Sequence, residues 1–437
     1  MGAGERGGED VEGFTMTELE YPKNWSCTRL KNVALVNENS LSTSTHSDYV
    51  LNYLEISNVN NRGIISKNQI RELFFSDAPS RARRIVRNGD TVISSVRPNL
   101  QALAYIKHTP ENLIASTGFY VVTPLQKLLD EKYTYYLLIS DGSRQHLEAA
   151  AKGVGYPAVD DKDFVTLKFS IPSIEEQQRI ASYLDKNCAT IDKAIEAKQK
   201  QLEILDALRK SIIHKAVTRG LDDSVELKDS GVEWLGKTPK HWNVRRIKRY
   251  AQIKRGASPR PIADQIYFDD DGEYAWVRIA DVSASDRYLE KTTQKLSDLG
   301  ASLSVKQNPG DLFISIAGTV GKPIITKIKC CIHDGFIWFD NPKFNKDFLY
   351  YIFLSEAPYQ GLGKLGTQLN LNTDTIGQIF ISIPSKKEQL HIVDCLDKKC
   401  SELTELQTNI KDQISTLEQY RKSLIHECVT GKRRSAG

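Results

Sequence analysis

Apolar residues recur at intervals of three and four positions along two long stretches of the chain, residues 173–218 and 385–430. This interval places them on one side of an α-helix, and charged residues fill the other sides. Each stretch opens with proline and serine, Pro172-Ser173 and Pro384-Ser385, and a glutamate follows the serine at capping-box spacing. Each therefore predicts a helix of about 43 residues, roughly 65 Å long at 1.5 Å per residue.

The apolar positions of both helices fit the seam of a coiled coil. A helix of this length cannot bury such a stripe alone, and its nearest equivalent partner is its own repeat. We therefore expect antiparallel pairing, with one globule at each end. Two alternatives stay open: each helix packs separately on its own domain, or the helices pair between molecules. The seam, interrupted by Lys198 and Gln407, comprises Ile180, Leu184, Cys188, Ile191, Ile195, Leu202, Leu205, Leu208, Ile212 and Ala216, and then Ile392, Leu396, Cys400, Leu403, Ile410, Ile414, Leu417, Tyr420, Leu424 and Cys428.

The two helical stretches are copies of one sequence. Residues 171–218 align without a gap on residues 383–430, with 19 identities in 48 positions. A second repeat lies 217 positions apart, where Tyr21-Pro22-Lys23-Asn24-Trp25 returns as Thr238-Pro239-Lys240-His241-Trp242. The residues between these anchors diverge. The chain is therefore a tandem repeat in which a variable globular unit precedes a constant helix.

Each globule mixes short strand-like runs with helical stretches. The strand-like runs are Thr91–Val96, Phe119–Val122, Leu312–Ile316 and Ile324–Ile328, and the helical stretches are Tyr133–Leu138 and Phe348–Leu354. The fold class that we predict is α+β: two globular α+β domains separated by a two-helix antiparallel coiled coil, with a pseudo-two-fold internal repeat. The expected domains are residues 17–172 and 238–384. The other segments are a disordered leader at 1–16, spacer helices at 173–218 and 385–430, a linker at 219–237 and a tail at 431–437.

Composition narrows the class of protein. A chain of 437 residues suits two or three domains, and no run approaches the eighteen apolar residues of a membrane span. The seven cysteines are odd in number and form no C-x-x-C pair, which argues against disulfides or a zinc knuckle and favours a reducing cytoplasm. A net charge of +4 neither proves nor excludes a polyanionic partner.

Basic residues gather once in each globule. Arginine and asparagine make bidentate contacts to guanine and adenine edges, while lysine and arginine neutralise phosphates. One such cluster alone could equally be a solvated face, but two clusters on two divergent copies favour nucleic acid. The candidates are Arg81, Arg83, Arg84, Arg87, Arg97 and Asn99 in the first globule, and Arg245, Arg246, Lys248, Arg249, Lys254, Arg255 and Arg260 in the second.

Sites of catalysis are not evident from the motifs. Gly318–Pro323 departs from the spacing of a phosphate-binding loop, so we expect a β-turn there. Glu226-Leu227-Lys228 has the acid-x-lysine form of a nuclease site but stands in a polar linker without a supporting strand. Asp269–Asp271 suits a solvated loop. His214 and His426 recur at equivalent helix positions and suit packing better than metal binding. The adenine-methyltransferase motifs are also missing. We therefore expect no catalytic residues, bound metal or cofactor in this chain.

These phrases together resemble the specificity subunit of a type I restriction-modification system. The similarity covers nearly everything from Met16 to Gly431. The first globule departs from the pattern at Gly153–Pro157, where the second has Gly366–Asn370. The matching phrases include both copies of the Pro-Lys-x-Trp motif, Ile171–Ile180, Ile212–Gly220, Ser230–Gly236, Gly310–Lys322 and Gly366–Asn370; the last two add Lys322, Gln368 and Asn370 to the DNA-binding candidates.

This resemblance implies a bipartite DNA target, with one half-site read by each domain and the unspecified gap set by the helices. It also implies partners: double-stranded DNA, two adenine methyltransferase subunits that use S-adenosylmethionine, and an ATP-driven restriction translocase. The cofactors would belong to those partners, and no membrane is involved. Two alternatives from other classes stay open. One is an enzyme with an unrecognised site in one globule, and the other is a coiled-coil protein–protein adaptor without DNA specificity.

Overall fold

The computed structural model describes residues 21–60, 63–96, 102–108, 110, 112–153, 157–360, 362 and 371–433. It divides into two compact units, one formed by residues 1–197 with 412–437 and the other by residues 198–411. The dividing points fall within two long helices, α5 (Ile174–Arg219) and α10 (Lys386–Val429), so each unit contains a segment of each helix. The predicted leader, residues 1–16, lies outside the described residues.

The first unit is built on two four-stranded sheets, with strand orders β2-β9-β6-β7 and β4-β3-β8-β5. Neighbouring strands are antiparallel except for β3 and β8. A separate antiparallel pair, β1 and β10, joins the start of the domain to the strand that precedes α5. The strands are β1 (Ser26–Arg29), β2 (Ala34–Val36), β3 (Val50–Leu54), β4 (Arg71–Phe74), β5 (Ala82–Ile85), β6 (Thr91–Ser94), β7 (Leu103–Tyr105), β8 (Leu113–Ser116), β9 (Phe119–Pro124) and β10 (Lys168–Ile171).

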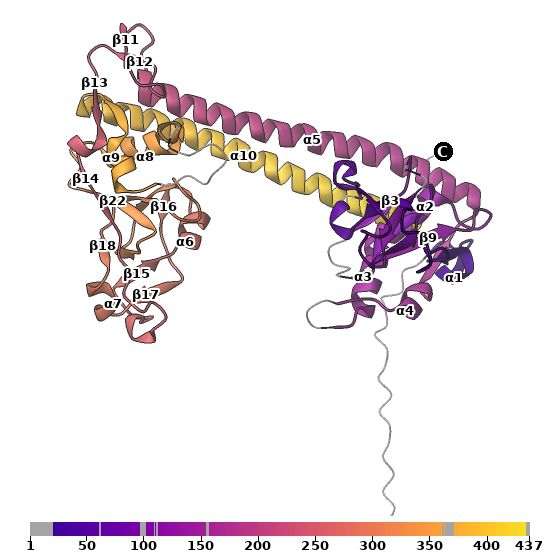
Figure 1. Cartoon of the computed structure of the whole chain (residues 1–437). Coiled ribbons are helices and arrows are strands. Elements are labelled where there is room, and N and C mark those ends of the chain that lie inside the picture. Colours follow the sequence, from indigo (N-terminus) through magenta and orange to yellow (C-terminus); the bar gives the residue numbers. More distant parts are fainter. Residues whose placement is uncertain are drawn as a thin grey trace, which may run out of the picture. The chain divides into compact units, whose positions relative to one another are not determined.

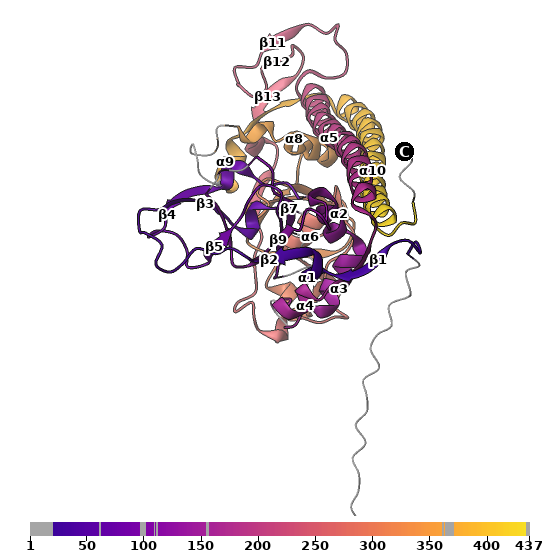
Figure 2. The same ribbon diagram turned by 90° about the vertical axis from the view of Figure 1, so that its right-hand side faces the viewer.

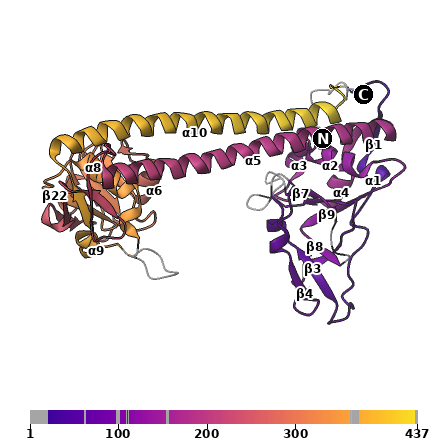
Figure 3. The ribbon, with the colours of Figure 1, turned by 90° about the horizontal axis from the view of Figure 1, so that it is seen from above.

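Four short helices complete the first domain: α1 (Leu30–Val33), α2 (Glu131–Ile139), α3 (Asp141–Ala150) and α4 (Asp161–Val165). The Asp130 side chain begins α2 by accepting hydrogen bonds from the backbone N–H groups of Lys132 and Tyr133, which is the usual chemistry of an N-cap. Within this unit, β9 and α2 lie nearer to α5 than β3 and β4 do (Figure 3). The sheet that contains β3 and β4 is therefore the part of the domain remote from the helix.

The second unit has a five-stranded sheet, β14-β22-β19-β20-β16, and a four-stranded sheet, β17-β15-β21-β18. Two strand pairs, β13–β23 and β11–β12, stand apart. The strands are β11 (Leu227–Asp229), β12 (Lys237–Pro239), β13 (Asn243–Arg246), β14 (Gln252–Arg255), β15 (Tyr274–Val277), β16 (Tyr288–Leu289), β17 (Gln294–Leu296), β18 (Val305–Gln307), β19 (Leu312–Ser315), β20 (Pro323–Thr326), β21 (Cys330–Ile332), β22 (Phe336–Asp340) and β23 (Phe380–Ile383). The short helices are α6 (Ile279–Ala284), α7 (Asp298–Ser302), α8 (Lys346–Leu354) and α9 (Thr373–Gln378).

Each unit combines strands and short helices with a segment of α5 and of α10 (Figure 1). Strand for strand, the second unit repeats the topology of the first. The order β2-β9-β6-β7 returns as β14-β22-β19-β20, and β4-β3-β8-β5 returns as β17-β15-β21-β18. Even the parallel pair β3–β8 recurs as β15–β21. The second unit adds β16 and the β11–β12 pair. The predicted α+β class and internal repeat are confirmed, and globules that diverge in sequence keep one topology.

In the first unit, the beginning of α5 packs against the end of α10 (Figure 2). Leu184 of α5 and Ile425 of α10 belong to one buried cluster. Arg421 of α10 pairs with Asp192 of α5, with 3.1 Å between Nε and Oδ1. In the second unit the end of α5 and the beginning of α10 share another buried cluster. The helix segments therefore pair antiparallel, as predicted.

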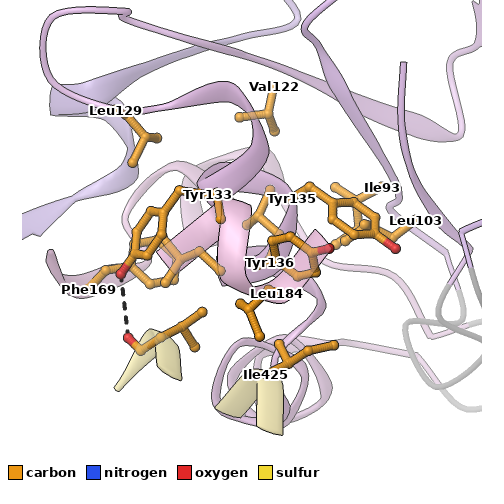
Figure 4. Close-up of a cluster of buried hydrophobic side chains, with 14 of the residues drawn as sticks. Ile93, Leu103, Val122, Leu129, Tyr133, Tyr135, Tyr136, Phe169, Leu184 and Ile425 are labelled. Carbon is orange, nitrogen blue, oxygen red and sulfur yellow. Dashed lines mark hydrogen bonds between the residues drawn. The ribbon is translucent and has the colours of Figure 1, made fainter. Parts of the chain in front are cut away.

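In each domain one helix rich in aromatic residues packs against the segments of α5 and α10 in the same unit. In the first unit Tyr133, Tyr135 and Tyr136 of α2 pack in one cluster with Leu184 and Ile425, and all five are labelled in Figure 4. The Tyr133 hydroxyl donates to the backbone carbonyl of Val429 at 3.5 Å. Helix α8 supplies the corresponding aromatic residues of the second unit, Phe348, Tyr350 and Tyr351. Each domain is thus in contact with both long helices.

The predicted seam is wrong at two equivalent positions. Leu208 and Tyr420 were assigned to it, but they are 44% and 48% exposed. The buried positions of α5 run through Ile195 and resume at Ile213, a step that fits the 3.6-residue period of a straight helix. Seven residues after Leu202 and Ile414 come Arg209 and Arg421, and both are half-buried. The seam therefore continues through these two arginines, and Leu208 and Tyr420 lie one position outside it.

The linker predicted at 219–237 contains a strand, because β11 pairs with β12. The interpretation that Glu226-Leu227-Lys228 lacks a supporting strand is therefore wrong. The Lys228 ammonium donates to the backbone carbonyls of Lys240 and Trp242, at 2.8 and 2.7 Å. This lysine therefore holds the start of the second domain. None of the described helices combines the length and apolar character that crossing a bilayer requires.

A buried glutamine joins each domain to its long helix. Gln177 of α5 is 1% exposed, and its side-chain oxygen accepts from the Asp130 backbone N–H at 2.9 Å. Gln389 of α10 is 2% exposed and accepts from the Asn345 N–H at 2.8 Å. Asp130 and Asn345 are the N-cap residues of α2 and α8. A buried glutamine amide at the same position of the repeat therefore fixes the start of the aromatic helix in both copies, α2 in the first and α8 in the second.

Replacing Gln389 with leucine should destabilise the second unit by roughly 2–6 kcal/mol. The Asn345 N–H and the Pro384 carbonyl, which accepts from the Gln389 amide at 2.9 Å, would lose their partners, at about 1–3 kcal/mol for each buried group. Urea denaturation of Gln389→Leu measures this loss. The control is Gln294→Leu on the exposed part of β17. Equal unfolding midpoints for the two variants would show that the buried amide is not a structural joint.

Candidate nucleic-acid interface

The first basic cluster lies on β5, an edge strand of the sheet β4-β3-β8-β5. Arg83 and Arg84 are half-buried within the strand, while Arg81 and Arg87 flank it and are exposed. A β-bulge lies between Ala82 and Arg84, so Arg83 is the extra residue and side chains do not simply alternate between the two faces there. The cluster therefore places two arginines at an irregular point of one sheet edge.

Two arginines of this cluster have ordered side chains in which some N–H groups make no hydrogen bond to the described residues. The Arg83 guanidinium lies over the Phe75 ring at 4.8 Å, and its Nε donates to the Ser80 carbonyl at 3.2 Å. Arg84 donates from Nη1 to the Ser40 hydroxyl at 3.3 Å. Arg83 Nη1 and Arg84 Nε are buried and have no hydrogen-bond partner among the described residues. Oriented guanidinium groups of this kind suit acceptors on a phosphate or a base edge.

The second cluster separates into two groups in the structure. Arg245 and Arg246 lie on β13, and Lys248 and Arg249 follow it; all four are exposed. Arg246 lies over the Phe380 ring at 5.0 Å, and Arg245 donates only to its neighbouring carbonyl. Within the described part of the chain, none of the four forms an ion pair. They constitute a group of unneutralised cations beside the β13–β23 ladder.

Two of the other three cations of the second cluster are ion-paired. Lys254 pairs with Asp340 at 2.5 Å, and Arg260 pairs with Asp334 at 3.1 Å. Arg255 donates to the backbone carbonyl of Asp334 at 2.5 Å, which leaves its charge in place. Opposite charges this close to Lys254 and Arg260 reduce the field that a polyanion would experience. The second cluster is therefore less uniform than its sequence suggests.

Lys322 faces inward rather than standing free in solvent. Its ammonium donates to the backbone carbonyls of Ser283 and Ser285, at 3.3 and 2.5 Å, and burial lowers its pKa. Gly318–Pro323 forms a tight turn between β19 and β20, as expected from the sequence; in it, Gly321 donates its N–H to the Ser315 carbonyl at 2.8 Å. A role of Lys322 in DNA binding would require it to release these carbonyls. The remaining candidates, Arg97, Asn99, Gln368 and Asn370, lie outside the described residues.

Potential sites of metal chemistry are scarce in the described part of the chain, which holds no group of three or more His, Cys, Asp or Glu residues suited to an ion. The seven cysteines are free thiols. Asp269–Asp271 form an exposed turn. His214 lies 6.3 Å from the Trp234 ring, and burial lowers its pKa.

The sequence did not predict the residues that join each domain to its long helix. Besides the buried glutamines, these residues are an aspartate of the helix and a tyrosine of the domain. Asp185 and Asp397 accept hydrogen bonds from Tyr136 and Tyr351. Both aspartates stand in the repeated Leu-Asp-Lys phrase, and both tyrosines in a repeated Tyr-Tyr pair. The signal was present as an identity between copies. What the sequence could not supply was which aspartate faces which tyrosine.

Comparison with known proteins places these features in a family. The family model "Type I restriction modification DNA specificity domain" matches residues 22–211 and again residues 239–416. The MjaVIII specificity subunit of Methanocaldococcus jannaschii is 28% identical over 70% of this chain and 71% of its own length. The HindI specificity subunit of Haemophilus influenzae is 23% identical over 82% and 89%.

Solved structures share the fold. A chain from a structure on complex assembly and conformational transition of a type I R-M system has a TM-score of 0.76 at 22% identity, covering 95% of this chain and all of its own. The HsdS subunit of Thermoanaerobacter tengcongensis has a TM-score of 0.53 at 21% identity, covering 95% and 99%. The doubled family match accounts for both copies of the repeat. This chain therefore belongs to the family of type I restriction-modification specificity subunits, the non-catalytic components of those systems.

Proposed function

We propose that this chain recognises a bipartite DNA target and directs a partner adenine-N6 methyltransferase to it, and with that enzyme an ATP-dependent restriction translocase. Residues 17–172 would bind one half-site and residues 238–384 the other. One observation carries the proposal: a single domain topology occurs twice, on helix segments that pair antiparallel, in a chain of the specificity-subunit family. A duplicated frame with unlike surfaces suits the recognition of two unlike sequences.

The basic residues of the two copies coincide only in part, which supports unlike half-sites. Arg83 and Arg84 lie on β5, whereas the corresponding strand β18 has Lys306, whose ammonium lies 4.5 Å from the Tyr274 ring centroid. On β13, Arg246 has a counterpart in Arg29 of β1, whereas Arg245 corresponds to Thr28. The proposed DNA-binding residues are Arg81, Arg83, Arg84, Arg87, Arg97 and Asn99 in the first domain, and Arg245, Arg246, Lys248, Arg249, Lys254, Arg255, Arg260, Lys322, Gln368 and Asn370 in the second.

Exposed apolar residues on the long helices support protein partners. Leu208 and Tyr420, at equivalent positions of the repeat, are exposed, and so are Ile204, Leu390 and Leu406. Large apolar side chains in solvent on a helix mark interaction surfaces when they recur. Because Leu208 and Tyr420 are equivalent, we propose that two methyltransferase subunits bind, one to each helix. S-adenosylmethionine and ATP would be bound by the partners.

A protein–protein adaptor without DNA specificity is the alternative function. Its interfaces would depend little on salt, whereas binding to duplex DNA releases counterions and weakens steeply as salt rises. The unneutralised group Arg245, Arg246, Lys248 and Arg249 favours DNA. A cytoplasmic location follows from that partner, and the seven free thiols are compatible with it.

Alanine substitutions at the basic clusters should weaken DNA binding. If Arg245 and Arg246 contact phosphates, the paired Arg245→Ala and Arg246→Ala variant should lower the salt slope by about 0.9 for each lost contact. If Arg83 and Arg84 contact bases, their replacement should instead relax discrimination by roughly 1–3 kcal/mol per base pair. Binding is measured on duplex DNA across a salt series, with exposed Lys107→Ala and Lys295→Ala as controls. Binding equal to that of the controls in both variants would reduce the clusters to solvated faces.

Exchanging residues 20–170 for the equivalent domain of a related protein should change one half-site only. The reason is that the β1–β10 and β13–β23 pairs enclose each domain separately. The measurement is a map of methylated adenines in a host that carries the exchanged chain with its methyltransferase. A change in both half-sites would contradict independent recognition.

The gap between half-sites should follow the length of the helices. One heptad inserted after Lys200 and another after Asp412, equivalent positions of the repeat, preserve the seam and add about 10 Å at 1.5 Å per residue. The same methylation map should then give both original half-sites with a longer gap. An unchanged gap, or new bases within a half-site, would refute the role of the helices as a spacer.

A further inference from the structure

Each domain makes a tyrosine–aspartate hydrogen bond to its long helix, and the two aspartates are equivalent positions of the repeat. In the first unit the Tyr136 hydroxyl donates to Asp185 of α5 at 2.7 Å. In the second, the Tyr351 hydroxyl donates to Asp397 of α10 at 2.5 Å. Asp185 and Asp397 are separated by the 212 positions of the helix repeat. The tyrosine–aspartate pair is therefore a duplicated feature of the joint between domain and helix.

The cation that accompanies this pair comes from a different element in each unit. In the first, Lys132 of α2 lies one helical turn before Tyr136, and its ammonium is 3.1 Å from Asp185. The corresponding position of α8 is Asp347, with the opposite charge. The second unit takes its cation from Arg287, between α6 and β16, whose guanidinium reaches Asp397 at 2.5 Å and Asp347 at 2.6 Å.

Arg287 is well enclosed for a charged residue. Its side chain is 13% exposed, and its guanidinium lies 5.0 Å from the Tyr288 and Tyr350 ring centroids and 5.2 Å from that of Tyr351. Although burial alone would lower the pKa of this guanidinium, Tyr351 and the two carboxylates raise it. Removing the guanidinium would leave Asp347 and Asp397 without the cation they share.

These contacts stand at a fixed distance from the buried glutamines. Asp185 follows Gln177 by eight residues, and Asp397 follows Gln389 by eight, about 12 Å along a helix at 1.5 Å per residue. A single polar contact leaves a domain able to pivot about it. Two directional contacts, separated along one helix, fix the direction in which the domain projects from that helix.

We propose that Asp185 with Lys132, and Asp397 with Arg287, act as positioning residues that hold each recognition domain in one orientation on its helix and so restrict the DNA target to one gap length. The inference rests on the proposed function. We call these groups the polar latches: Lys132, Tyr136 and Asp185 in the first unit, and Arg287, Asp347, Tyr351 and Asp397 in the second.

The repeat itself supplies the test. Arg287→Ala removes the cation of the second latch. Adding Asp347→Lys to that variant places a lysine where the first unit has Lys132, so the double variant should rebuild the arrangement of the first latch. Lys295→Ala, an exposed residue of the same domain, is the matched control. Hydrogen exchange of the α8 amides in the full-length chain reports the joint, and methylated-adenine mapping with the partner methyltransferase reports the gap.

Arg287→Ala should raise the exchange rate of the α8 amides about tenfold or more, because a half-buried ion pair loses one partner. Methylation should then occur at the original half-sites with a second gap length, one base pair from the original. Arg287→Ala with Asp347→Lys should restore slow exchange and a single gap, and Lys295→Ala should change neither.

Three results would overturn the proposal. Faster exchange with an unchanged single gap would make Arg287 a purely structural residue. A double variant that remains as loose as Arg287→Ala would show that the effect does not pass through the carboxylates. Unchanged exchange in Arg287→Ala would show that the latch holds nothing. If the unaltered chain directed no methylation at all, the proposed function would fail, whereas the exchange data would still decide whether the latch orders the joint.

Discussion

The burial of one apolar stripe on each long helix is the constraint on which the rest of this molecule depends. Helix α5 has 46 residues and α10 has 44, and helices of that length gain most of their stability from tertiary packing. In each unit the stripe is covered from two sides, by the other long helix and by the aromatic helix of the domain, α2 or α8. The helices therefore need the domains as much as the domains need the helices.

This shared burial explains which parts of the repeat stay alike. Gln177 and Gln389, Asp185 and Asp397, and the paired tyrosines all sit where domain and helix meet. Replacing either glutamine would leave buried polar groups without a partner, at a cost of about 1–3 kcal/mol for each group. Exposed positions of the edge strands, such as Lys306 of β18, carry no such penalty because their side chains meet solvent. The two domains keep one strand topology while the residues of their edge strands differ. A subunit that recognises two unlike sequences needs such a constant frame with variable surfaces.

The features that could be predicted from sequence are those set by local periodicity. The two helices, their antiparallel pairing and the duplicated α+β domains follow from spacings within one segment or from identities between segments. The strand order could not be predicted, because pairings such as β3 with β8 join residues far apart in sequence. Leu208 and Tyr420 were misassigned because the seam position beside each is held by an arginine, Arg209 or Arg421, where an apolar residue was expected. The basic clusters could be located by composition, but the pairing of Lys254 with Asp340 and the inward turn of Lys322 depend on distant segments.

The polar latches carry this contrast furthest. Arg287 reaches aspartates that lie 60 and 110 positions further along the chain, so no local pattern could have connected them. Yet Lys132 and Arg287 satisfy equivalent aspartates from unrelated elements. The aspartate of the long helix therefore needs a cation beside it, and that cation can come from different elements of the domain. Any domain that brings a cation to that aspartate can be accommodated, which explains how two globules with unlike sequences are joined to their helices in the same way.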